Sequence, residues 1–123
     1  MREETKDRAN AICKYLYNKK AEDIAMIDVE NLTIIAGCFV LASGRSTTQV
    51  KALCDEVDEK MEKEQGEKYM RMDGYEAGRW IVLDYGDVLL HIFHEDERKF
   101  YNLERLWEDG FNTVRYSGEA KAE

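Results

Sequence analysis

Two stretches of the chain repeat their apolar residues at the spacing of an amphipathic helix. From Ala9 to Tyr17, apolar side chains recur at i, i+3, i+4, i+7 and i+8. Further on, Ser46 and Gln49 have the pattern of a capping box, in which the serine hydroxyl accepts a hydrogen bond from the first helical turn. The apolar series behind it continues along the helix, and Gly66 is placed to end it. The pattern therefore predicts two long helices, each burying one stripe.

Five further segments have the length and apolar content of β-strands. They are residues 23–29, 38–43, 69–72, 79–84 and 87–94. Only Tyr85-Gly86 separates the last two, which predicts a β-hairpin with a two-residue loop. A third helix is predicted over residues 95–107. This order of elements predicts an α/β (α+β) fold with one mixed five-stranded sheet and amphipathic helices.

The C-terminal residues differ in pattern from the rest. Residues 110–123 are polar, contain glycine and show no periodicity, so we expect a flexible tail after a single domain spanning residues 1–109. At 123 residues the chain can bury a core without disulfides or metals. Its cysteines, Cys13, Cys38 and Cys54, lie in apolar surroundings without a CxxC pair, which favours buried, reduced thiols.

The predicted hairpin divides its side chains between two faces of different character. With Tyr85-Gly86 as the loop, Asp84 pairs with Asp87, and Trp80 lies opposite His91. One face is aliphatic and is expected to pack under the helices; it carries Ile81, Leu83, Val88, Leu90 and Ile92. The other face mixes aromatic, acidic and imidazole groups; it carries Trp80, Val82, Asp84, Asp87, Leu89, His91 and Phe93.

Two interpretations of the mixed face remain open on these residues alone. A helix can cover it, with its polar groups satisfied by neighbours, because mixed sheets often have both faces covered. Alternatively, the face is exposed and docks a partner, since aromatic side chains with a few carboxylates are typical of interface anchors. Asp84 and Asp87 can also simply accept amide hydrogen bonds at the turn.

The charge balance bears on the class of partner. The chain has 26 acidic and 18 basic residues and a formal net charge of -8. Binding phosphates requires a basic stripe, so we expect little direct nucleic-acid contact. The acidic excess instead suits electrostatic steering toward a basic protein. The N-terminus is charged in both signs and is not followed by an apolar segment, which predicts a cytoplasmic protein without a signal peptide or membrane span.

Three constellations resemble parts of enzyme sites, but each is incomplete. His91 and His94 form an HxxH pattern, yet on a strand this spacing points them to opposite faces, and the sequence has no third histidine. Gly44-Arg45-Ser46 stands at a strand-to-helix junction suited to a phosphate, but its serine already acts as an N-cap. Asp84 and Asp87 offer a carboxylate pair for magnesium, far along the chain from that junction. We therefore expect no enzymatic activity, no cofactor and no metal site.

A series of motifs in order carries a family resemblance. The string from Asp84 to Phe93, Asp-Tyr-Gly-Asp-Val-Leu-Leu-His-Ile-Phe, is followed by Arg98, Phe100-Tyr101, Leu103-Glu104 and Leu106-Trp107. Earlier in the chain stand Lys20-Ala21-Glu22-Asp23-Ile24, Asp28-Val29, Ser43-Gly44-Arg45-Ser46, Val50-Lys51-Ala52-Leu53 and Gly78-Arg79-Trp80. Together these motifs resemble the ribosomal silencing factor, or Iojap-related, family over about Ala9 to Trp107.

The resemblance implies a function, a fold and a partner. The family binds the large ribosomal subunit through ribosomal protein L-fourteen, on the face that meets the small subunit, and thereby blocks subunit association and represses translation under nutrient limitation. The implied fold has nucleotidyltransferase-like topology, from which no enzymatic activity is carried over. A homodimer is implied for the free protein. A nucleotidyltransferase-like enzyme and a large-subunit assembly factor remain the alternatives.

The family's docking surface is implied to include its hairpin tryptophan, which matches Trp80 and agrees with the mixed face. The predicted partner-binding residues are Trp80, Asp84, Tyr85, Asp87, His91, Phe93, Arg98 and Tyr101. Arg98 and Tyr101 have an alternative role in bracing the third helix against the sheet. Leu103, Leu106 and Trp107 are expected to pack in the core.

Overall fold

The first long helix forms where the apolar spacing predicts it. The computed structural model describes residues 1–118, and its helix α1 (Glu3–Asn18) buries one stripe of side chains against the sheet. Ala9, Ile12 and Leu16 in this stripe are completely buried. The helix also extends further toward the N-terminus than the apolar pattern alone indicated.

The second long helix has the predicted start and end. α2 (Thr47–Gln65) begins after Ser46, whose hydroxyl accepts a hydrogen bond from the Gln49 amide at 3.1 Å. The Gln49 side chain accepts in turn from the Arg45 amide at 2.7 Å, one residue further out than in a standard capping box. Gly66 ends α2 at a φ of +68°, a left-handed conformation open to glycine.

The strands form one mixed sheet in the order β3-β4-β5-β2-β1-β6. Its strands within residues 1–118 are β1 (Glu22–Asp28), β2 (Cys38–Gly44), β3 (Arg71–Asp73), β4 (Trp80–Asp84), β5 (Val88–His94) and β6 (Thr113–Arg115). β2 and β5 are parallel neighbours, and the other pairs are antiparallel. The predicted α+β class with a mixed sheet is confirmed, with one strand more than the five predicted.

The sixth strand corrects the predicted domain boundary at residue 109. β6 pairs with β1, so that Val114 lies opposite Met26. Just before β6, the Asn112 side-chain amide donates hydrogen bonds to the carbonyls of Asp28 and Trp107 at 3.0 and 2.8 Å. Residues 112–115 therefore belong to the sheet, although their short, polar pattern did not indicate a strand. Residues 119–123 of the expected tail lie outside the described residues.

The hairpin register also differs from the predicted one. Asp84 lies opposite Leu89 rather than Asp87, and Trp80 lies opposite Phe93 rather than His91. The loop is shifted by one residue because Gly86, at a φ of +94°, takes its first central position, where type II′ turns require glycine. The two registers differ by two residues on β5, an even number, so the predicted division into two faces is unchanged for the residues that pair across β4 and β5.

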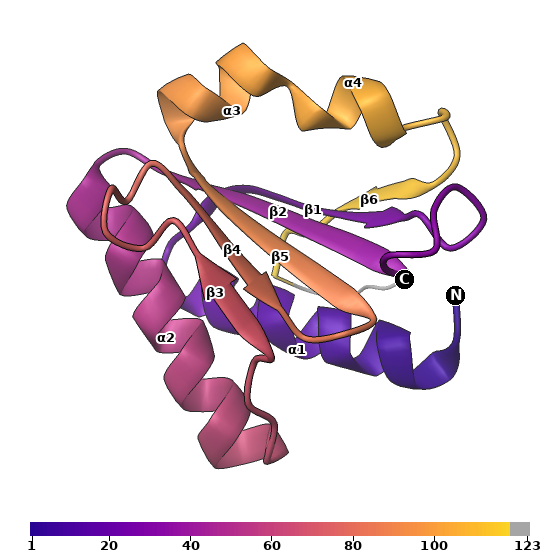
Figure 1. Cartoon of the computed structure of the whole chain (residues 1–123), viewed down its shortest axis with the longest axis horizontal. Helices are drawn as coiled ribbons and strands as arrows, with labels where there is room; N and C mark the ends of the chain where they lie inside the picture. Colours follow the sequence, from indigo (N-terminus) through magenta and orange to yellow (C-terminus); the bar gives the residue numbers. More distant parts are fainter. Residues whose placement is uncertain (119–123) are drawn as a thin grey trace.

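The predicted third helix is divided into two short helices. α3 (Glu95–Tyr101) and α4 (Leu103–Trp107) are separated by Asn102, whose φ of +46° is left-handed and ends the first helix. Asparagine tolerates this conformation better than other non-glycine residues. The break lets α4 leave the axis of α3 and lie along the sheet (Figure 1).

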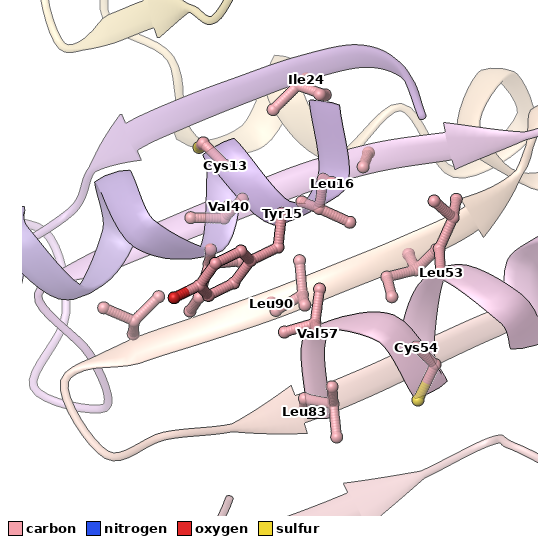
Figure 2. Close-up of a cluster of buried hydrophobic side chains, with 14 of the residues drawn as sticks. Cys13, Tyr15, Leu16, Ile24, Val40, Leu53, Cys54, Val57, Leu83 and Leu90 are labelled. Carbon is pink, nitrogen blue, oxygen red and sulfur yellow. The ribbon is translucent and has the colours of Figure 1, made fainter. Parts of the chain in front are cut away.

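Two layers of helices enclose the sheet. α1 and α2 cover the face that we call the inner face, and α3 and α4 lie over the opposite, outer face (Figure 1). Figure 2 shows aliphatic side chains of α1, α2 and the sheet converging under the inner-face helices, among them Leu16, Val57 and Leu90. As predicted, the inner face of the hairpin is aliphatic and completely buried; its residues are Ile81, Leu83, Val88, Leu90 and Ile92.

The cysteines are part of this core. Cys13, Cys38 and Cys54 are buried and free, as predicted. Burial raises the pKa of the Cys38 and Cys54 thiols to about 12. Within residues 1–118, no helix is long and apolar enough to cross a membrane.

Candidate partner-binding site

Ring side chains form a row across the outer face, from α3 to the middle of the sheet. The Trp80 indole, on β4, has its centroid 4.8 Å from the Tyr101 ring and 4.8 Å from the Phe93 ring. The Phe100 ring lies 5.0 Å from Tyr101, and His91 stacks on Phe93 with 13° between the ring planes. We call these five residues the aromatic row. It brings together four of the predicted partner-binding residues and adds Phe100.

The aromatic row is buried at one end and exposed at the other. Phe93 is fully buried and His91 is 8% exposed. Tyr101 is 49% and Phe100 is 80% exposed, while Trp80 stands between them, half-buried. Only the Phe100, Tyr101 and Trp80 end can therefore meet a partner in this conformation.

Helix α4 covers the region beside the buried end. Its Leu103 and Trp107 side chains pack against the buried outer-face cluster, and the Trp107 ring meets Phe39 edge-on at 5.2 Å. The predicted mixed face is thus neither fully open nor fully covered. His91 and Phe93 are buried because the helices pack over this part of the sheet, and partner contact by either residue stays a prediction.

Arg98 is the brace that holds the outer helices in place. It is 8% exposed, and its guanidinium donates hydrogen bonds to Ser43 Oγ at 2.8 Å and to the Asp23 carbonyl at 2.8 Å. It also pairs with Glu104 at 2.7 Å, across the break between α3 and α4. Burial opposes ionisation of Glu104, but Arg98 and Arg115 outweigh it and hold the pKa of Glu104 below its usual value. Arg98 therefore takes the bracing role that the sequence left open, and its burial is at odds with direct partner contact.

Asp87 faces the inner layer rather than the mixed face. Its carboxylate accepts hydrogen bonds from the Thr5 hydroxyl and from Arg8 Nη1 on α1, each at 2.6 Å. Arg8 also bonds Glu67 at 2.6 Å, so one guanidinium ties the hairpin turn to the segment after α2. Strand alternation placed Asp87 wrongly because it is a loop residue, outside the ladder that imposes the alternation.

The other two turn residues are also engaged within the protein. The Asp84 carboxylate accepts a hydrogen bond from the Gly86 amide at 2.7 Å, which is the local turn role that the sequence analysis allowed. Tyr85 is 7% exposed and packs with the inner-face core, where burial raises the pKa of its phenol. Partner contact by Asp84 stays a prediction, whereas burial speaks against one by Tyr85.

Comparison with known proteins gives this surface a context. The family model described as "ribosomal silencing factor during starvation" matches residues 2–123. The chain belongs to the ribosomal silencing factor family. It is 44% identical over 101 residues to the ribosomal silencing factor RsfS of Halalkalibacterium halodurans, covering 82% of this chain and 85% of that protein.

The fold of this protein is also that of solved structures. It matches a crystal structure of a Chromobacterium violaceum protein with a TM-score of 0.80 and 33% identity, over 94% of this chain and 95% of the other. A mouse relative named "mitochondrial assembly of ribosomal large subunit protein 1" is 30% identical over 94 residues, which are 75% of this chain and 41% of that protein. The bacterial relative is named as a silencing factor and the mouse relative as an assembly protein, neither as an enzyme.

The residues of the enzyme-like constellations have structural roles in this protein. Arg45 pairs with Glu22 at 2.7 Å, and Ser46 caps α2. His94 Nδ1 accepts a hydrogen bond from the Asp96 amide at 3.1 Å and so caps α3. Among the residues that the structure describes, no group of His, Cys, Asp or Glu side chains is arranged to hold a metal ion.

Two exposed apolar residues were missed by the sequence analysis. Phe100 was quoted only as part of the family motif, and Leu106 was expected in the core but is 74% exposed. Leu103 and Trp107 pack inward as predicted. The error for Leu106 arises because the break at Asn102 changes which side of the helix faces the sheet; an asparagine in a helical pattern was the signal available.

Proposed function

We propose that this protein is a ribosomal silencing factor that binds the large ribosomal subunit through ribosomal protein L-fourteen, sterically blocks association with the small subunit, and represses translation in the cytoplasm under nutrient limitation. Family membership supports the ribosomal role. The observation that carries the contact surface is the exposed end of the aromatic row, where Trp80, Tyr101 and Phe100 follow one another in ring contact.

The exposed end has the composition of a protein-binding surface. Three large rings stand together, and Leu106 on the adjoining helix adds an aliphatic side chain that is 74% exposed. Aromatic side chains supply much contact area for little lost conformational freedom, so they dominate binding energy in many interfaces. The half-buried Trp80 is fixed by its neighbours and is the strongest candidate for the central anchor.

The charge of the chain supports a basic partner. Its net charge of -8 produces a field that attracts a basic ribosomal protein over several ångströms and raises the association rate at low salt. In this division of roles the acidic residues steer the encounter, while the aromatic rings provide the contact. Raising the salt concentration should therefore slow association more than it speeds dissociation.

The mechanism is steric exclusion. A protein that covers a surface needed for subunit contact prevents joining for as long as it stays bound. An interface of roughly 1,600 Å² in total is enough for specific binding. No bond is made or broken in such a mechanism, which agrees with the structural roles of Ser46, Asp84 and Asp87.

The test is a subunit-joining assay. The protein is added to purified large subunits, small subunits follow, and the joined particle is measured on a sucrose gradient. We expect less joined particle with wild type, and Trp80→Ala is expected to weaken binding by about 2 kcal/mol, roughly 30-fold. Tyr17→Ala, which removes a half-exposed ring from the opposite layer, is the control. Unchanged joining with saturating wild type would contradict the proposal.

A role in large-subunit assembly is the second candidate, and the name of the mouse relative favours it. It predicts that the protein is enriched on immature rather than on mature large subunits. Quantifying the protein across gradient fractions from growing cells separates the two, since silencing requires binding to mature subunits. Both roles can use the same surface.

We also propose that the free protein is a homodimer that buries the exposed end of the aromatic row. An exposed group of rings is unfavourable in water, so self-association through it lowers the free energy of the free protein. Light scattering of wild type and Tyr101→Ala tests this. A monomeric wild type at micromolar concentration would contradict it.

A further inference from the structure

His91 is a buried imidazole whose hydrogen bonding indicates a role beyond packing. It lies on β5, two positions from Phe93, the residue opposite Trp80, and its Nδ1 is 3.1 Å from Trp80 Nε1. An indole N–H can only donate a hydrogen bond, so Nδ1 accepts it and carries no proton. In a neutral imidazole the proton is then on Nε2.

The second nitrogen, Nε2, makes a histidine at this position unfavourable for the stability of the folded state. Nε2 is buried and has no hydrogen-bond partner within residues 1–118. A buried polar group without a partner destabilises the folded state, and an aromatic hydrocarbon ring would fill the same space without that cost. Packing against Phe39 and Phe93 therefore does not account for a histidine here. The bond to Trp80 does.

The surroundings keep His91 in its neutral form, in which Nδ1 can accept a hydrogen bond from the indole. Phe39 meets its ring edge-on at 5.2 Å, Phe93 stacks on it, and Trp80 covers it from β4. Burial is the cause of a pKa of His91 lowered to about 4, and no charged neighbour contributes. At neutral pH the imidazole is uncharged, and its Nδ1 lone pair remains available to the indole.

We propose that His91 is a positioning residue for the ribosome contact: it engages the Trp80 N–H inside the protein and holds the half-exposed indole in one orientation. This inference rests on the proposed function. Because the N–H is already bonded internally, Trp80 presents ring carbon to its partner. The matching group on the partner is therefore an aliphatic side chain, or a lysine or arginine cation over the ring, rather than a hydrogen-bond acceptor.

Two variants separate positioning from packing. His91→Phe keeps a ring of similar size and removes the acceptor. His91→Asn is smaller but places Oδ1 near the position of Nδ1, so it keeps the acceptor. We expect His91→Phe to retain or gain thermal stability, since the unpartnered Nε2 is gone, and to bind purified large subunits about fivefold to tenfold more weakly. We expect His91→Asn to lose stability and to bind within about twofold of wild type.

A spectroscopic readout makes the test independent of the ribosome. The indole N–H resonance of Trp80, assigned by its loss in Trp80→Phe, reports the hydrogen bond directly. It should exchange faster with solvent in His91→Phe and remain protected in wild type and His91→Asn. Trp107, the other tryptophan, serves as the internal reference.

Two outcomes overturn the inference, and a third separates it from the proposed function. Binding of His91→Phe that equals wild type shows that the orientation of Trp80 does not matter. Stability and affinity that fall together in both variants show that His91 acts only through packing. If wild type binds no large subunit, the proposed function falls and the ribosome contact with it, while the indole resonance still decides whether His91 orients Trp80.

Discussion

The two faces of the sheet are built by different chemistry. The inner face is a continuous, mainly aliphatic layer between the sheet and two long helices, and its side chains are buried (Figure 2). The outer face has a smaller buried cluster, several rings, and two short helices held by the polar contacts of Arg98. Burial of apolar area makes the largest contribution to the stability of the inner face. On the outer face, a few hydrogen bonds and ion pairs position the short helices α3 and α4, which leave one end of the aromatic row exposed.

This difference indicates that one side of the sheet mainly provides stability and that the opposite side provides the proposed binding surface. Substitutions on the inner face should act on folding, and those at the exposed end of the aromatic row should act on binding. Substitution of residues between them, such as His91 and Arg98, should change either stability or binding without an equal change in the other. Each of the following predictions tests a part of that division.

The largest effect is expected from Leu90→Ala on the inner face. Leu90 is completely buried between the sheet and the helices, so its truncation leaves a cavity and should cost about 3 kcal/mol of the free energy of unfolding. Urea unfolding measures it. Leu106→Ala, at an exposed position, is the matched control and should change stability by less than about 0.5 kcal/mol. Equal losses in the two variants would remove the distinction between the faces.

Arg98→Met should loosen the outer helices selectively. The substitution leaves Glu104 half-compensated by Arg115 and Ser43 without its donor, at a cost of roughly 2 kcal/mol. Hydrogen exchange should accelerate in α3 and α4 and stay unchanged in α1. Arg105→Met, at an exposed position of α4, serves as the control. An equal loss of protection in α1 would show that the outer layer cannot open separately.

Acidification should destabilise the protein through the outer face. The pKa of His91 is about 4 when folded against 6.5 for an ordinary histidine, so between these values the unfolded chain binds a proton that the folded protein does not. Stability is therefore full above pH 6.5 and decreases as pH falls toward 4, by about 2 kcal/mol from pH 7 to pH 5. Urea unfolding at both pH values measures this. A His91→Phe variant that keeps the whole decrease would assign it to other groups.

The smallest effect, and the sharpest comparison, concerns two tyrosines. Tyr101 on the outer side is 49% exposed and Tyr17 on α1 is 46% exposed. Tyr101→Ala should weaken large-subunit binding by about 1 kcal/mol, whereas Tyr17→Ala should leave it unchanged. Co-sedimentation with purified large subunits gives both values. Equal losses would mean that the partner does not distinguish the two sides.

Sequence reasoning was most reliable where one physical signal dominated. Helical spacing located α1 and α2, and the capping residues Ser46 and Gly66 located the ends of α2. The parity of strand positions assigned the paired residues of β4 and β5 to the correct faces even though the register was wrong, because an even shift preserves the faces; it failed only for the loop residue Asp87. These features depend on local chemistry that neighbouring residues determine.

Features that depend on distant partners could not be predicted in the same way. β6 is only three residues long and exists because β1 offers it an edge. The burial of His91 and Phe93 depends on where α3 and α4 pack, and that depends on a single left-handed asparagine. Asp87 is turned inward by Arg8, which lies 79 positions away in the chain. Of the predicted site residues, Trp80 and Tyr101 lie at the exposed end of the aromatic row, whereas His91, Phe93 and Arg98 are buried; partner contact by any of them stays a prediction.

The pairing of β6 with β1 also protects the protein from aggregation through an open sheet edge. Without β6, the seven residues of β1 would present unpaired amides and carbonyls beside an apolar run from Ile24 to Ile27, which is a template for adding a strand from another molecule. With β6 in place, the sheet ends on three-residue strands at both sides, β3 and β6, each bearing charge. A chain ended at residue 109 should therefore aggregate, even though its inner-face core is intact.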